Sequence, residues 1–146
     1  MKIAIGSDHR GIEQRKIIAA AVIAAGHTPI DYGACSTEPV DYPDVAAEVA
    51  RQVACGAADF GVLLCGTGIG VSIAANKVAG IRAAVCCDLE MARLSRQHNN
   101  ANVLCLSGER STPAEFGELV TVWLATAFEG GRHARRVEKI TALEKR

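Results

Sequence analysis

Short apolar runs alternate with amphipathic segments along almost the whole chain, and this alternation is the feature that most restricts its fold. The runs that read as strands cover residues 2–6, 28–33, 59–65, 81–86 and 102–106. The segments with helical spacing of apolar residues cover 11–25, 43–56, 67–78, 88–98 and 112–128. Strands that alternate with helices and are continuously apolar form parallel sheets covered on both faces. The sequence therefore predicts an α/β fold with a doubly wound, Rossmann-like parallel sheet of five strands.

The 146 residues suit a single domain. The tail, about residues 130–146, carries one thin apolar stripe of Val137, Ile140 and Leu143, which is too little to fold alone. We therefore expect a helical C-terminal tail that packs on the domain or on a second copy of it.

Composition and charge argue against several classes of protein. Sixteen basic and sixteen acidic side chains cancel, so the chain lacks the positive field of a nucleic-acid or membrane surface. The N-terminal apolar run is too short for a signal peptide and no run reaches membrane-spanning length, which predicts a cytoplasmic protein. Six cysteines without a C-x-x-C pair fit neither a zinc site nor a secreted disulfide framework.

Polar residues gather directly after the predicted strands. In an open parallel sheet, ligands bind beyond the carboxyl ends of the strands. The residues found there are Ser7-Asp8-His9, Cys65 with the following glycines, Cys87-Asp88, and Ser107-Gly108-Glu109-Arg110. These positions are the first candidates for a functional site.

The loop after the third strand is built to hold an anion. Gly66, Gly68 and Gly70 let backbone N–H groups approach an oxyanion, and the next helix adds its positive end. A dinucleotide fingerprint would need glycine or alanine at Val71 and should follow the first strand, although Asp88 stands where a ribose-binding acid is expected. A nucleotide P-loop lacks its Gly-Lys-Ser/Thr, and a Cys-x5-Arg phosphatase would need arginine in place of Val71.

Cys65 stands out among the cysteines because glycines follow it and a helix begins beside it. Such a position favours the thiolate, which acts as a nucleophile or a general base. The alternative is a buried strand cysteine that behaves as a small hydrophobe, and we interpret Cys55, Cys86 and Cys105 in that way. Thr67 can cap the helix and hydrogen-bond a ligand or the thiol.

Five segments closely resemble one known family. They are "GSDHRG" at 6–11, "DYPD" at 41–44, "CGTGIGVSIAANKVAGIRAA" at 65–84, "SRQHNNANVL" at 95–104 and "EGGRHARRVEKI" at 129–140. Together they resemble the type B ribose-5-phosphate isomerase family, which includes the galactose-6-phosphate isomerase subunits. The resemblance covers essentially the whole chain in the same order.

The resemblance implies a cofactor-free and metal-free aldose–ketose isomerase of sugar phosphates. It also implies active sites shared across a homodimer interface, and leaves open whether dimers pair into tetramers. The reaction moves a proton between C1 and C2 through a cis-enediolate, which requires a base, a site for the oxyanion, a ring opener and a phosphate anchor.

By resemblance, Cys65 is the base and His98 opens the sugar ring. Asp8 fixes sugar hydroxyls, and Thr67 and Asn99 add hydrogen bonds to the oxyanion. The backbone N–H groups that hold it belong to Gly66, Thr67, Gly68, Ile69 and Gly70. Without the resemblance, Asp8 reads as a helix cap, His98 as a helix C-terminal histidine and Asn99 as a turn residue.

The same resemblance assigns the phosphate to His9, Arg110, Arg132 and Arg136, and places Tyr42 in the pocket wall. Arg132 and Arg136 stand four apart, so both guanidinium groups face one side of a helix. The neighbouring Arg135 reads as solvated. His27 and His133 read as surface residues without a role.

Two other substrates or functions stay open at this point. A six-carbon sugar phosphate, such as allose or galactose 6-phosphate, is the rival within the family, although in the galactose enzymes one of two different subunits lacks the cysteine that this chain keeps. A non-catalytic sugar-phosphate or nucleotide-binding module is the rival outside it. Ser7 departs mildly from the family, since many relatives carry cysteine there.

Overall fold

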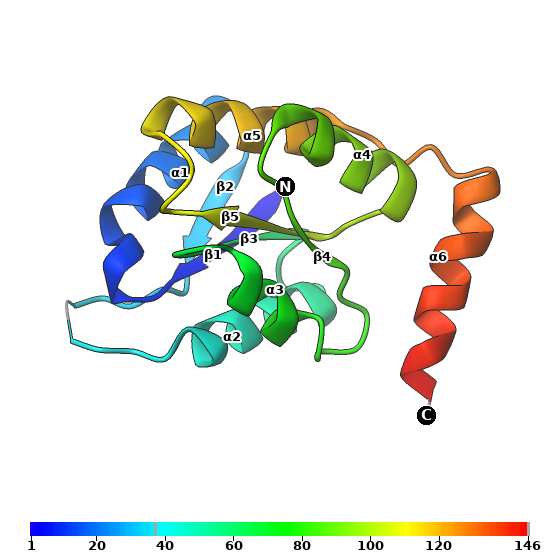
Figure 1. Cartoon of the computed structure of the whole chain (residues 1–146), viewed down its shortest axis with the longest axis horizontal. Helices are drawn as coiled ribbons and strands as arrows, with labels where there is room; N and C mark the ends of the chain where they lie inside the picture. The colour runs from blue at the N-terminus through cyan, green and yellow to red at the C-terminus, as the bar shows by residue number, and fades with distance from the viewer. Residues whose placement is uncertain (37, 146) are drawn as a thin grey trace.

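The computed structural model describes residues 1–36 and 38–145, and the strands within them form one parallel sheet (Figure 1). The five strands of this described part lie in the order β2-β1-β3-β5-β4. Their bounds are β1 Lys2–Ser7, β2 Thr28–Asp31, β3 Phe60–Cys65, β4 Ala83–Val85 and β5 Val103–Ser107. The predicted α/β fold with a five-stranded parallel sheet is confirmed.

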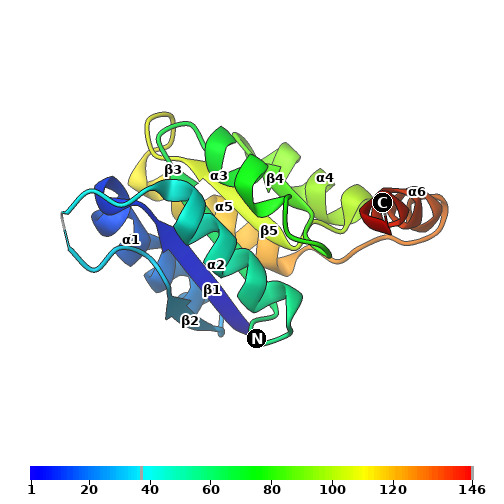
Figure 2. The same cartoon turned by 90° about the horizontal axis from the view of Figure 1, so that it is seen from below.

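Helices cover both faces of the sheet, as the apolar strands require. The helices are α1 Ile12–Ala24, α2 Tyr42–Ala54, α3 Ile69–Ala75, α4 Leu89–Asn99, α5 Pro113–Ala125 and α6 Arg132–Ala142, with short 3-10 turns η1 His9–Gly11 and η2 Leu143–Lys145. Figures 1 and 2 show α1, α5 and α4 on one face and α2 and α3 on the other. The inner strands β1, β3 and β5 are therefore mostly buried, whereas the edge strands β2 and β4 are only partly covered.

Alternate residues of each strand enter different halves of the core. Ile3 and Ile5 of β1 pack with α1 and α5, whereas Ala4 between them packs with α2 and α3. Trp123 of α5 is fully buried and meets Phe60 edge to face, with ring centroids 5.2 Å apart. Phe60, Phe116 and Trp123 thus fill the larger half of a mainly aliphatic core, whereas Tyr32 packs against the other half.

Helix α2 lies unusually close to the sheet because glycine faces it from β1. A Cβ on Gly6 would come within 2.7 Å of Val45 and 2.8 Å of Val49. This close approach brings the start of α2, with Tyr42, next to the carboxyl end of β1. The small residue in the strand therefore helps to shape the edge where ligands bind.

Helix α3 is shorter than the predicted 67–78. It begins at Ile69 because Gly68 has φ 78°, a left-handed conformation that a helix cannot contain. It ends before Asn76, whose side-chain amide bonds both the N–H and the C=O of Ala83 at 2.8 and 2.9 Å. Since β4 is an edge strand, Asn76 satisfies backbone groups that no further strand pairs.

The tail forms α6, which touches the end of α4 and stands beside the α/β body (Figure 1). Its Glu144 accepts a hydrogen bond from the N–H of Gly80 at 2.9 Å. Ile140 and Leu143 of the predicted stripe remain 43% and 60% exposed. Thr37, and Arg146 at the end of the predicted tail 130–146, lie outside the described residues.

Two predictions about burial are wrong. Cys55 is exposed rather than packed as a small hydrophobe, because it is the C-cap of α2, in the turn that precedes β3. His133 is buried, with 5% of its surface exposed, because its ring stacks on that of His98. Cys86 and Cys105 are buried as predicted. Within the described residues, the helices are all too short or too polar to cross a membrane.

Candidate active site

Residues from three loops meet at the carboxyl edge of the sheet, as the strand ends predict. A cavity of about 390 Å³ is lined by side chains and backbone that follow β1, precede or begin α2, and follow β3. Its lining includes Asp8, His9, Tyr42, Cys65, Gly66, Thr67 and Gly70. Seven of the predicted site residues are thus brought together on one chain.

Cys65 ends β3 with its side chain half-buried at the wall of this cavity. Its Sγ accepts a hydrogen bond from the backbone N–H of Gly68 at 3.1 Å. The backbone around it is fixed from β5: the N–H of Gly108 bonds the Cys65 carbonyl at 2.8 Å, and Ser107 Oγ bonds the Gly66 carbonyl at 2.7 Å. The thiol is therefore accessible to a ligand while its position is set by backbone contacts.

Two glycines of the loop are required by their surroundings. At Gly68, φ is 78° and a Cβ would lie 3.1 Å from the backbone of Leu106. At Gly70, a Cβ would lie 2.6 Å from the ring of Tyr42. Thr67 Oγ1 accepts the N–H of Ile69 at 3.3 Å, although Gly68 and not Thr67 occupies the N-cap position of α3.

Asp8 and His9 each hold a neighbouring loop. Asp8 caps η1, since its Oδ1 accepts the N–H of Arg10 at 3.0 Å. The N–H of Val40 donates to His9 Nδ1 at 3.3 Å and so ties the loop before α2 to the end of β1. Tyr42 follows two residues later, 40% exposed over Gly70. His9 and Tyr42 therefore face the same space as Cys65.

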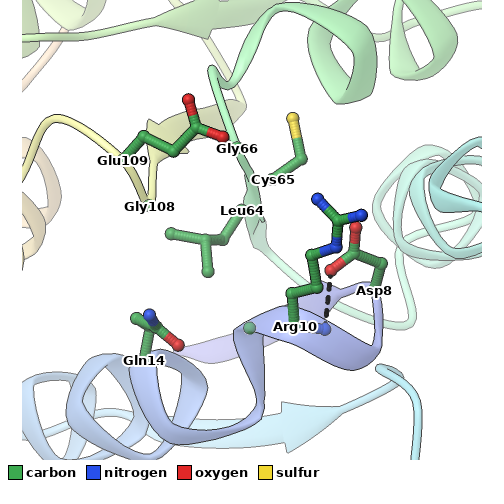
Figure 3. Close-up of a pocket in the computed structure, with 9 residues that line it drawn as sticks. Asp8, Arg10, Gln14, Leu64, Cys65, Gly66, Gly108 and Glu109 are labelled. Carbon is green, nitrogen blue, oxygen red and sulfur yellow. Dashed lines mark hydrogen bonds between the residues drawn. The ribbon is translucent and has the colours of Figure 1, made fainter. Parts of the chain in front are cut away.

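A smaller cavity of about 130 Å³ adjoins Cys65 from the side of β5 (Figure 3). Figure 3 shows the side chains of Glu109 and Arg10 on opposite sides of the strand end that carries Cys65. Gln14 also lines this cavity, and its buried Oε1 has no partner among the described residues. Sequence reasoning assigned these three residues no role, although Arg10 and Glu109 follow strand ends and that signal was available.

Arg15 supports the carboxyl edge of the sheet, and the sequence did not predict this role. It is 5% exposed and donates to the carbonyl and the hydroxyl of Ser7, at 3.2 and 2.9 Å, and to the carbonyl of Ala34 at 2.6 Å. Its Nε pairs with Asp31 at 3.0 Å. The serine at position 7 thus serves as a partner of a buried guanidinium, and the loop after β2 is held against β1.

The remaining predicted residues lie at two different places. Arg110 follows β5 at the carboxyl edge, where its N–H bonds Ser107 Oγ at 3.2 Å. His98 and Asn99 end α4, which returns from the carboxyl end of β4 to the amino end of β5. The six residues of β3 span about 20 Å, so one chain keeps His98 and Cys65 at opposite edges of the sheet.

Arg132 and Arg136 share the end of the molecule with His98. Both are exposed on α6, four residues apart on one side of the helix. The histidine and the arginines form an arrangement suited to binding an anionic, hydroxylated ligand, but they lie apart from the thiol of the same chain.

The two histidines at this end are packed together. Their rings stack with centroids 4.1 Å apart and an interplanar angle of 11°. Burial lowers the pKa of His133, and the neighbouring His98 and Arg132 act in the same direction. His133 is therefore neutral over a wider pH range than an ordinary histidine.

The buried cysteines contrast with Cys65. Burial raises the pKa of Cys86 to about 11 and raises that of Cys105. Both thiols stay protonated and inert at neutral pH. Among the described cysteines, Cys65 alone lines the cavity that holds the other predicted site residues.

The chain is similar to known isomerases over its whole length. A family description, Ribose/Galactose Isomerase, matches residues 3–140. The ribose-5-phosphate isomerase B of Escherichia coli (strain K12) is 50% identical, over 99% of this chain and 97% of its own. The solved type B ribose 5-phosphate isomerase of Trypanosoma brucei is 51% identical with a TM-score of 0.96, covering 98% of each chain. That of Mycoplasma genitalium with bound ribulose-5-phosphate is 44% identical with a TM-score of 0.94, covering 99% of this chain and 96% of its own.

Proposed function

The chain belongs to the ribose/galactose isomerase family, as a type B ribose-5-phosphate isomerase, and we propose that it interconverts ribose 5-phosphate and ribulose 5-phosphate. The observation that carries this proposal is the position of Cys65. Its sulfur lies at the wall of a cavity and accepts a backbone N–H, while Gly66, Thr67 and Gly70 of the glycine loop line the same cavity. A thiolate there is placed to take a proton from one sugar carbon and return it to the next.

The glycine loop supplies the oxyanion site in this mechanism. As the proton leaves C2 of the aldose, negative charge develops on the carbonyl oxygen at C1, and backbone N–H groups from Gly66 to Gly70 stabilise it. Thr67 adds a side-chain hydrogen bond to the oxyanion, and Asp8 holds the sugar hydroxyls. The proton of the O2 hydroxyl passes to O1 as the C2=O2 double bond forms, and the proton carried by Cys65 returns to C1. No covalent bond between enzyme and sugar forms.

A second copy of the chain completes the site. Ring opening is assigned to His98 of the partner subunit, because His98 and Cys65 of one chain lie at opposite edges of the sheet. The exposed apolar side chains Ile69 and Ile73 of α3, and Ile140 and Leu143 of the tail, support such an assembly. The proposed active unit is therefore a homodimer with two shared sites.

The phosphate is assigned to groups from both subunits. His9 and Arg110 approach it from the chain that supplies Cys65, and the partner subunit's Arg132 and Arg136 approach it from α6. Two guanidinium groups on one helix side bind a dianion with paired hydrogen bonds. Within one chain, Arg132 and Arg136 lie far from the thiol of Cys65. Sharing of the site between two subunits explains this separation.

Subunit mixing tests the shared site. Cys65→Ala and His98→Ala are each expected to be almost inactive, whereas unfolding and refolding them together restores activity. Random reassortment yields roughly half mixed dimers, each with one intact site of two, so about a quarter of the wild-type activity returns. No recovery, with mixed dimers confirmed by mass, would show that both residues act from one chain.

The substrate is tested with a panel of aldose phosphates of five and six carbons, with the free sugars as controls. Ribose 5-phosphate is expected to have the highest kcat/KM. A higher value for a six-carbon phosphate would overturn the substrate assignment. Binding without exchange of the C2 hydrogen into solvent would instead indicate a non-catalytic module.

A further inference from the structure

His98 belongs to a cluster with Glu129 and His133 that the proposed mechanism does not yet use. Oε2 of Glu129 lies 3.9 Å from Nε2 of His98 and 3.6 Å from Nε2 of His133. The two imidazole rings stack, so His133 covers one face of the His98 ring. The His98 side chain nevertheless remains 36% exposed. His133 is thus the buried support of the pair, and His98 is the accessible ring.

Backbone contacts hold the cluster in place. The N–H of Glu129 donates to the carbonyl of Gln97 at 3.1 Å, next to His98. Gly130 and Gly131 then turn the chain with φ of 66° and 53°, and the N–H of His133 donates to the carbonyl of Gly130 at 3.0 Å. The sequence after α5 is therefore arranged to bring a carboxylate and a second ring against His98.

A metal site is the first alternative for two histidines and a glutamate. Nε of Arg132, however, donates to Nε2 of His133 at 3.5 Å. This contact sets a permanent positive charge against the nitrogen that a cation would need. The electrostatics of the cluster favour support of His98 over binding of a cation.

We infer that Glu129 and His133 are positioning residues for ring opening, an inference that rests on the role proposed for His98. His133 fixes the ring plane of His98 by stacking. The carboxylate of Glu129, 3.9 Å from Nε2 of His98, favours the proton on that nitrogen, which leaves Nδ1 to act on the sugar. Nδ1 takes the proton of the anomeric hydroxyl and returns it to the ring oxygen O4. The C1–O4 bond breaks as the C1=O1 double bond forms, so atoms and electrons balance.

Substrates with and without a ring separate this role from a general structural one. Ribose 5-phosphate closes a furanose ring, whereas erythrose 4-phosphate cannot, because its C4 oxygen carries the phosphate. Glu129→Gln and His133→Ala are expected to lower kcat/KM for ribose 5-phosphate about 10-fold and to leave that for erythrose 4-phosphate within about 2-fold. His133→Phe keeps the stacking and is expected to retain most of the activity.

Glu138→Gln is the matched control, because Glu138 is exposed on the same helix and also loses one charge. It is expected to behave as wild type on both sugars. Equal losses on the two sugars for Glu129→Gln and His133→Ala, or no loss on ribose 5-phosphate, would overturn the inference. Dimer content is measured for every variant, so that a loss of assembly is recognised.

Ring opening is also measured directly, whatever the turnover of erythrose 4-phosphate. In the Cys65→Ala background isomerisation stops, but the enzyme is expected to accelerate exchange between the two anomers of C1-labelled ribose 5-phosphate, followed by NMR. Adding Glu129→Gln is expected to remove most of that acceleration, and unchanged exchange contradicts the inference. Wild-type protein that isomerises neither sugar would contradict the proposed function itself. This outcome differs from one in which only the inference about Glu129 and His133 fails.

Discussion

The two edges of the sheet are built in different ways. At the carboxyl edge, Cys65 and the glycine loop are held by backbone hydrogen bonds from β5, and the cavity walls follow directly from strand ends. At the amino edge, His98 depends on a stacked side chain and on a helix, α6, that stands beside the body (Figure 1).

This difference indicates that the two edges of the sheet serve different parts of the proposed reaction. Proton transfer tolerates little misplacement, and Cys65, the base in our proposal, ends a strand whose loop is held by hydrogen bonds from β5. The groups that we assign to ring opening and phosphate binding lie where a second copy can reach them, and the apolar tail residues Ile140 and Leu143 stay exposed on the single chain. In our proposal, each edge of the sheet therefore carries half of a shared site.

The largest expected effect comes from the carboxyl edge. Cys65→Ala is expected to lower kcat for ribose 5-phosphate by about 10³-fold with KM changed less than about 3-fold, because a general base acts mainly in the transition state. Steady-state kinetics measure both constants. Cys55→Ala, which removes an exposed thiol from the end of α2, is the control and should leave both unchanged. A preserved kcat with weakened binding would remove Cys65 from the chemistry.

A smaller effect, and mainly on KM, is expected from the amino edge. Arg136→Ala should raise KM for ribose 5-phosphate by about 10-fold or more, since one charge-assisted hydrogen bond to a phosphate is worth roughly 1.5–3 kcal/mol. KM for the unphosphorylated sugar should stay the same. Arg135→Ala removes an equal charge from the neighbouring, exposed position and serves as the control. Equal effects of Arg136→Ala on both sugars would contradict the phosphate assignment.

The rigidity of the glycine loop is tested by stability. Gly68→Ala is expected to reduce the free energy of unfolding by about 1–2 kcal/mol, because alanine is strained at φ 78° and its Cβ would press on the Leu106 backbone. Gly117→Ala, in the open middle of α5, should instead be neutral or stabilise by up to about 1 kcal/mol. Denaturant unfolding measures both. If the two variants are equally stable, the loop tolerates a side chain at position 68.

The smallest effect concerns the stacked histidines and pH. Burial, aided by His98 and Arg132, lowers the pKa of His133 below 6.5, so the unfolded chain binds this proton at a higher pH than the folded chain. The stabilising contribution is complete above about pH 6.5 and is lost as the pH falls below it. His133→Phe is therefore expected to unfold with a shallower pH dependence between about pH 7 and pH 5. The denaturant midpoint of both proteins is measured across that pH range. The same slope of midpoint against pH in His133→Phe as in wild type would contradict this prediction.

The element order and the carboxyl-edge cluster were predictable from the sequence. Helical spacing and apolar runs are local patterns, so they indicated each strand and helix with errors of only a few residues. Strand ends in a parallel sheet meet at one edge, which predicted the neighbourhood of Asp8, Cys65 and Arg110. Boundaries such as the early end of α3 were missed, because they depend on Asn76 meeting Ala83 across a turn.

The buried polar side chains were not predictable. Arg15 bonds Ala34 from 19 residues away, and Arg96, also buried, lies 4.5 Å over the ring of Phe60. His133 looked like part of a solvated basic run, and only its stacking on His98 explains its burial. Such contacts join segments distant in the sequence, so no local pattern reports them.

The sequence by itself determined the fold class, the order of its elements and the loop that surrounds Cys65, because these follow from patterns within a few residues. Only the tertiary structure decided that His98 and Cys65 of one chain lie at opposite edges, that α6 stands beside the body, and that His133 supports its neighbour. The physical reason is that burial and side-chain partnership depend on which segments pack together, and that packing is a property of the whole fold.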